Sequence, residues 1–127
     1  MLIIRPTQFE VLAADADVVD RALILEDIHE NCGEIVTGIP EEALLDMIDA
    51  GVLKAQSFGF TRGSDCSTFV QFMLSQGANF YDHPEIRAIL VDQQIPLHRR
   101  LDVIADEVSD RVWHEVEQRY DNISAWD

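Results

Sequence analysis

Residues 63–77 read GSDCSTFVQFMLSQG, which is the plainest helical pattern in the chain. The apolar side chains of this stretch recur every three or four residues, so they share one face of an α-helix. They are Cys66, Phe69, Val70 and Met73. Gly77 supplies an end for the helix, because glycine readily adopts the conformation that closes a last turn. We therefore predict a helix here whose apolar face is buried.

Proline and glycine mark further helices on either side of this stretch. Pro40 suits a first turn and Gly59 a stop, while Pro84 and Pro96 each open another helix. The apolar face expected after Pro40 consists of Leu44, Leu45, Ile48, Val52 and Ala55. The last helix is expected to run without interruption and to display Leu97, Leu101, Ile104, Val108, Val112 and Val116.

The N-terminal part of the chain also has helical spacing. Thr7 and Glu10 fit a capping box, in which each side chain satisfies a backbone N–H at the start of a helix. The face expected to follow consists of Phe9, Leu12, Ala16, Val19 and Leu23, with Ile28 and Cys32 able to extend it and Gly33 as its end. Residues 7–32 form either one helix or two that break near residues 15–17, where aspartates can serve as caps.

No alternating apolar and polar run lies between hairpin turns, so the sequence gives little support for a sheet. No linker rich in glycine, serine or proline divides the chain, whose 127 residues suit one domain. We predict an all-α fold, a compact bundle of about five helices in which residues 1–127 form a single helical domain.

Acidic residues dominate the charge. The chain has 24 Asp and Glu against 9 Lys and Arg, a formal net charge of -15. Such a field repels nucleic acid and anionic membranes, so we expect neither as a partner. The acids concentrate before residue 54 and after residue 100, which favours recognition of a protein with a basic surface. We predict that Asp20, Glu26, Asp106 and Asp110 contact this partner.

The segment from Gly63 to Val70 resembles the nucleophile segment of NlpC-type, papain-like cell-wall peptidases. That resemblance implies a catalytic Cys66 at a helix start, with a histidine from a downstream strand as its base. Here Thr68 replaces the usual glycine, and His83, His98 and His114 lie in or beside predicted helices. We therefore interpret Cys66 as a core residue and predict that the protein is not an enzyme.

Metal and cofactor sites have weak support. His29 and Cys32 form only one close ligand pair, whereas structural zinc sites usually have two. His114 and Glu115 begin like the helical zinc-protease motif, but Gln118 stands where its second histidine is required. No glycine-rich loop follows a predicted strand. We predict no catalytic residue, no metal and no cofactor.

The stretch from Phe58 to Asp92 resembles a family of small bacterial proteins encoded beside type VI secretion toxins and spike proteins. The resemblance rests on Phe58-Gly59-Phe60-Thr61, Phe69, Phe72, Met73, Gly77, Phe80, Asp82, Pro84 and Ile89-Leu90-Val91-Asp92, with Gly51 to Ala55 upstream. Tyr81, between Phe80 and Asp82, departs from the family pattern. The resemblance implies association with secreted cargo as an immunity protein, a chaperone or an adaptor.

Together these features predict a cytoplasmic protein-binding module that recognises a secreted toxin or effector through acidic helical surface. Cytoplasm is the default because Met1 to Ile4 is too short an apolar run for a signal peptide. Two alternatives remain: an acidic nucleic-acid mimic that inhibits a basic nuclease, and the cysteine peptidase centred on Cys66. The choice among immunity protein, chaperone and adaptor, and the oligomeric state, stay open at this point.

Overall fold

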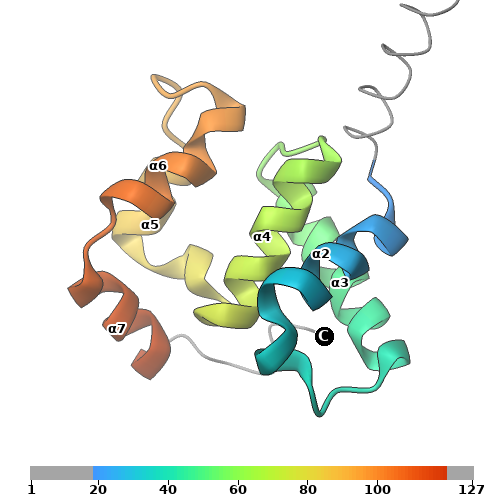
Figure 1. The fold of residues 1–127 in the computed structure, drawn as a ribbon. Coiled ribbons are helices and arrows are strands. Elements are labelled where there is room, and N and C mark those ends of the chain that lie inside the picture. The colour runs from blue at the N-terminus through green and yellow to red at the C-terminus, as the bar shows by residue number, and fades with distance from the viewer. Residues whose placement is uncertain (1–18, 120–127) are drawn as a thin grey trace, which may run out of the picture.

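The computed structural model describes residues 19–119, which are helical and contain no strand. Six α-helices and two short 3₁₀ helices, η1 and η2, occupy this range (Figure 1). Their bounds are α2 Arg21–Val36, α3 Glu41–Ser57, α4 Gly63–Ser75, η1 Phe80–Asp82, α5 Pro84–Leu90, η2 Leu97–Arg99, α6 Arg100–Glu107 and α7 Asp110–Arg119. The predicted all-α class is confirmed over these residues, with six α-helices where about five were expected.

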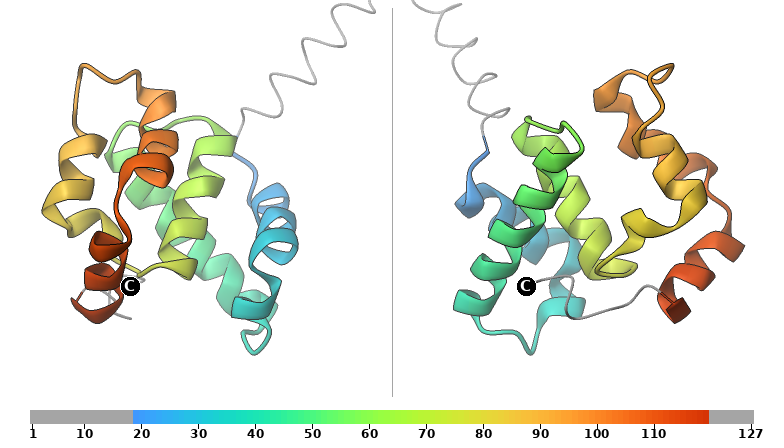
Figure 2. Two further views of the ribbon diagram at one scale, coloured as in Figure 1. Left: turned by 60° about the vertical axis from the view of Figure 1, so that its left-hand side comes forward. Right: turned by 180° about the vertical axis from the view of Figure 1, so that it is seen from behind.

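Helix α4 lies at the centre of the arrangement. α2 and α3 pack against one side of it, and α5, α6 and α7 lie on the other (Figures 1 and 2). Its predicted apolar face is buried throughout, because the side chains of Cys66, Phe69 and Val70 have no exposed surface and that of Met73 is 2% exposed. The apolar spacing that predicted this helix therefore also predicted which of its side chains are buried.

Local signals placed several helix ends correctly. Pro40 is extended and directly precedes α3, and Pro84 opens the first turn of α5. Gly59 has a φ of 100°, a conformation that favours glycine, and it lets the N–H of Phe60 return to the carbonyl of Ala55 (3.2 Å). Within the face predicted for α3, Leu45 is only half-buried.

The prediction of one uninterrupted last helix is wrong. The backbone of Val108 is extended (ψ 128°), which separates α6 from α7. Ser109 then starts α7, because its hydroxyl accepts the N–H of Val112 at 3.4 Å. The break turns α7 back toward α4, where Trp113 stacks on Phe72 with ring centroids 5.5 Å apart. Pro96 was expected to open this last helix, but it precedes the 3₁₀ helix η2, and α6 begins at Arg100.

The face predicted for the N-terminal helix is also corrected. Leu23 is 45% exposed, and the buried stripe consists of Ile24, Ile28, Cys32 and Val36. α2 begins at Arg21 after an extended Asp20, so residues 7–32 do not form one continuous helix. It bends at Cys32 (φ −125°, ψ 23°) and continues past Gly33, which was expected to end it. The capping box at Thr7 and Glu10, and Phe9, Leu12 and Ala16, lie outside the described residues.

Gly51 allows α3 and α4 to approach closely. A Cβ at this position would lie 2.7 Å from Cγ2 of Val70, a buried β-branched side chain that cannot easily move. By contrast, a Cβ at Gly33 of α2 would meet no atom within 4 Å.

We predict that Gly51→Ala lowers the free energy of unfolding by about 1–3 kcal/mol, because it overpacks the α3–α4 contact. Gly33→Ala is the matched control and should raise it by up to about 1 kcal/mol, because alanine favours the helix. Urea denaturation followed by circular dichroism measures both. Equal effects of the two substitutions would show that the close approach at Gly51 is not a constraint.

Candidate functional site

The four acids predicted to contact a partner fall into two groups that lie far apart. Asp20 and Glu26 belong to the start of α2, whereas Asp106 and Asp110 flank the break between α6 and α7. Figures 1 and 2 show α2 on one side of α4 and α6 and α7 on the other. One flat partner surface therefore cannot contact all four residues.

Two of these acids also stabilise their own helices. The carboxylate of Asp20 accepts the N–H of Ala22 at 2.9 Å and so caps α2. Asp110 lies in the first turn of α7, where a negative charge is favoured by the helix dipole. Their charges have a local structural explanation that requires no partner.

Glu26 belongs to an acidic row along α2. Glu30 and Glu34 follow it at intervals of four residues, and all three are exposed. We call Glu26, Glu30 and Glu34 the α2 acidic stripe. None of them forms an ion pair with a described residue. Like charges four residues apart in a regular helix repel each other, as Glu26 and Glu30 do before the bend at Cys32, so α2 carries this pair at a cost in stability.

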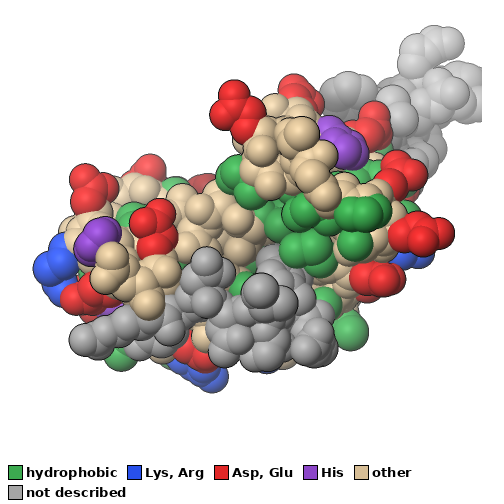
Figure 3. All heavy atoms as spheres, turned by 90° about the horizontal axis from the view of Figure 1, so that it is seen from below, with side chains coloured by type: hydrophobic (Ala, Val, Ile, Leu, Met, Phe, Trp, Pro, Cys, Tyr) green, Lys and Arg blue, Asp and Glu red, His purple; other side chains and the backbone are tan. Residues whose placement is uncertain are grey.

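An exposed apolar side chain adjoins the stripe. Leu23 is 45% exposed and precedes Glu26 by three residues, which puts the two on one face of α2. Seen from below, apolar side chains gather on the side formed by α2 and α3, with carboxylates around them (Figure 3). A partner could thus meet both charge and apolar surface at α2.

Asp106 stands in a different environment. It lies in the last turn of α6, which contains no basic residue, so the helix dipole disfavours its charge. Asp102, four residues earlier, is also exposed. This pair has the same spacing as Glu26 and Glu30, but it lies on the other side of α4.

The environment of Cys66 does not suit a nucleophile. Its thiol is fully buried and lies 3.7 Å from the carbonyl oxygen of Phe60. Burial, reinforced by the nearby charge of Asp65, raises the pKa of Cys66 to about 11, whereas catalytic cysteines have a lowered pKa. The described residues also contain no strand that could carry the family's histidine.

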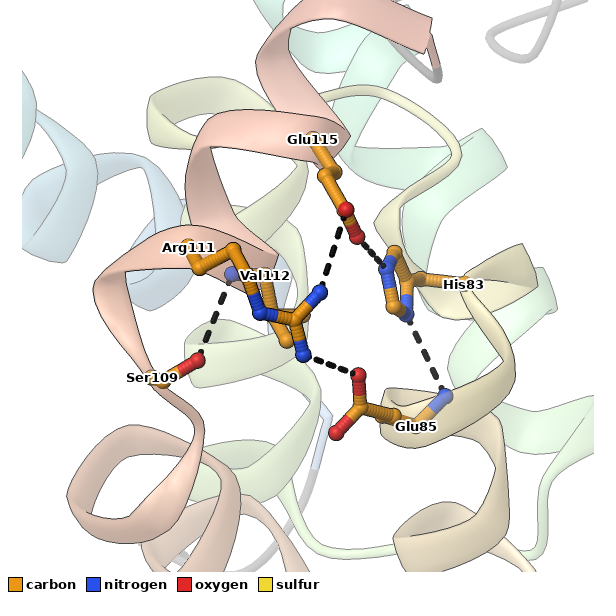
Figure 4. Close-up of polar contacts among 6 residues, drawn as sticks. All are labelled: His83, Glu85, Ser109, Arg111, Val112 and Glu115. Atoms are coloured by element: carbon orange, nitrogen blue, oxygen red, sulfur yellow. Dashed lines mark hydrogen bonds and ion pairs between the residues drawn. The ribbon is translucent and has the colours of Figure 1, made fainter.

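A polar network that the sequence did not indicate joins α5 to α7 (Figure 4). Nδ1 of His83 accepts a hydrogen bond from the N–H of Glu85 at 3.2 Å. In the neutral ring the proton is therefore on Nε2, which donates a hydrogen bond to the carboxylate of Glu115 at 2.8 Å. Arg111 bridges the carboxylates of Glu85 (2.9 Å) and Glu115 (3.1 Å). His83 and Glu115 are 32 residues apart, and no local motif links them.

The contacts in this network favour the ionised form of Glu115. The hydrogen bond from His83 lowers the pKa of Glu115, and the positive charge of Arg111 lowers it further. The hydrogen bond to Glu85 correspondingly raises the pKa of Arg111. Each of these side chains has a hydrogen-bond partner within the network, and the contacts fix α7 against the start of α5.

Comparison of the chain with protein families, with curated proteins and with solved structures finds no match. Among the described helices, none has the length and apolar character needed to span a bilayer.

We predict that Cys66 reacts slowly with 5,5′-dithiobis(2-nitrobenzoate) in the folded protein, because at about pH 8 a thiol with its pKa is about one-thousandth ionised. The measurement uses a Cys32→Ala variant, so that Cys66 alone is scored, with the same variant unfolded in guanidinium as its control. Labelling of the folded protein as fast as that of the unfolded chain would revive Cys66 as a nucleophile.

Glu115 should make stability depend on pH. Since folding lowers its pKa, its stabilisation is complete above the ordinary carboxyl pKa of about 4.3 and is lost as the pH falls through the lowered value. We expect Glu115→Gln to lower the free energy of unfolding at pH 7, and the difference from wild type to shrink in acid. Glu117→Gln, an exposed neighbour on α7, is the control and should show little difference. A pH-independent difference for Glu115→Gln would contradict this account.

Proposed function

We propose that the protein is a binding module that docks a basic surface of a partner protein onto the α2 acidic stripe. One observation carries this proposal: Glu26, Glu30 and Glu34 are exposed along α2, have no ion-pair partner among the described residues, and include a repulsive pair, Glu26 and Glu30, before the bend at Cys32. A basic partner would relieve this repulsion on binding.

The two stages of binding have separate physical causes. The net charge of -15 attracts a basic protein over a distance and so accelerates encounter. Leu23, half-exposed beside the stripe, then offers apolar surface that is removed from water when the complex forms. Charge should therefore govern the association rate, and apolar contact the dissociation rate.

The class of partner in this proposal comes from the resemblance of residues 58–92 to proteins encoded beside type VI secretion toxins. It favours a secreted toxin or effector, which this protein would neutralise or hold for loading in the cytoplasm. The burial and raised pKa of Cys66 support binding rather than catalysis.

The test compares two charge reversals of equal size and spacing. Glu26→Lys with Glu30→Lys alters the stripe, while Asp102→Lys with Asp106→Lys alters α6 on the other side of α4. A partner captured from the native host with the wild-type protein is purified, and its association with all three proteins is measured by surface plasmon resonance.

We expect the α2 reversal to slow association by about tenfold at low ionic strength and to change dissociation little. The α6 reversal should have a clearly smaller effect. Raising the ionic strength from about 0.01 M to about 0.1 M shortens the screening length from about 30 Å to about 10 Å, so it should reduce the difference. A stronger effect of the α6 reversal would show that the partner docks on α6 and α7 and not on α2. Indifference to salt and to both reversals would show that the acidity serves solubility alone.

A further inference from the structure

Among the charged side chains that line one cleft of this acidic protein, basic residues outnumber acidic ones. Its volume is about 700 Å³, and Lys54, Arg87 and Arg100 face it, with Asp82 as the sole carboxylate among the described residues that line it. The helices that flank it, α3 and α5, both face the viewer in the right-hand view of Figure 2. The three cations come from segments up to 46 residues apart, so only the folded chain brings them together.

Two of these cations have no carboxylate partner among the described residues. Two basic side chains outside the cleft do pair with acids, Arg21 with Asp49 and Arg111 with Glu85. Arg100 instead donates to the carbonyl oxygens of Leu90 (3.1 Å) and Ile95 (3.0 Å), and Nζ of Lys54 lies 5.2 Å from the centre of the Tyr81 ring. In a chain with 24 acids and 9 bases, this leaves a local excess of positive charge.

The cations are held in place before any ligand arrives. Arg87 lies over the ring of Phe58, 5.3 Å from its centre, and pairs with Asp82 at 3.3 Å. The two carbonyl contacts of Arg100 fix its guanidinium in the same way. Little side-chain entropy of the protein would therefore be lost when a ligand binds.

The size and surroundings of the cleft restrict the ligand. Its volume is in the range of small-molecule sites, whereas a long polyanion would meet the repulsion of the net negative charge. Arginine and lysine donors match the oxygens of carboxylate and phosphate groups. Val91, 54% exposed at the cleft, offers an apolar contact.

We propose that this cleft binds a carboxylate or phosphate group that has an apolar portion beside it. Such a group is presented either by a free small molecule or by an acidic residue in a protein segment. The site is separate from the α2 acidic stripe, so its test does not depend on the proposed docking surface.

Phenyl phosphate and benzoate are titrated into the full chain, and backbone amide shifts are followed by NMR. Shifts should cluster around the cleft and saturate. Inorganic phosphate lacks the apolar portion and benzyl alcohol lacks the charge, so both should bind at least several-fold more weakly. A blocked Phe-Asp dipeptide separates the two sources: tighter binding than the simple anions assigns the cleft to a protein segment, and weaker binding to a free anion.

Lys54→Gln should weaken phenyl phosphate binding by about tenfold, because a charge-assisted hydrogen bond is lost. Arg99→Gln makes the same change in net charge at an exposed residue outside the cleft lining and should change the affinity less than twofold. Absence of saturable shifts, equal effects of the two substitutions, or equally tight binding of either control compound would overturn the proposal. The amide spectra also report whether each variant is folded.

Discussion

The fully buried ring of Phe69 packs against aromatic rings from three other segments of the chain. Its centroid lies 5.1 Å from that of Phe80, 5.8 Å from that of Tyr81, 5.9 Å from that of Phe58 and 6.1 Å from that of Phe60. These rings come from the end of α3, the turn after it, and η1, so one buried side chain of α4 fixes all three. Tilted and stacked ring pairs at such distances stabilise a core beyond the area that they bury.

This cluster also shapes the surface. Phe58 and Tyr81 both pack on Phe69; Arg87 lies over the ring of Phe58, and Lys54 over that of Tyr81. The positions of two cleft cations thus follow from the packing of the core. The α2 acidic stripe depends on the same core in a simpler way, because burial of Ile24 and Ile28 turns the opposite face of α2 to solvent. A basic cleft and an acidic stripe can therefore coexist on one acidic chain.

Helix positions were largely predictable because their signals are local. Proline before α3 and at the first residue of α5, glycine after α3, and the apolar spacing of α4 each act within a few residues. Candidate acids could be named in the same way, but their grouping could not. The sequence alone did not indicate that Glu26 and Asp106 would lie on opposite sides of α4, since helix spacing gives a face and not its neighbours.

The sequence by itself determined the helical class, the starts of α3 and α5, the end of α3 and the buried face of α4, since capping and periodicity are properties of short segments. Tertiary structure decided the rest. The apolar spacing continues through Val108 and so does not separate two helices from one; in the fold Ser109 caps α7 and Trp113 packs against Phe72. Contacts distant in sequence, such as His83 with Glu115 and the convergence of Lys54 with Arg100, arise because the core sets the relative positions of whole helices.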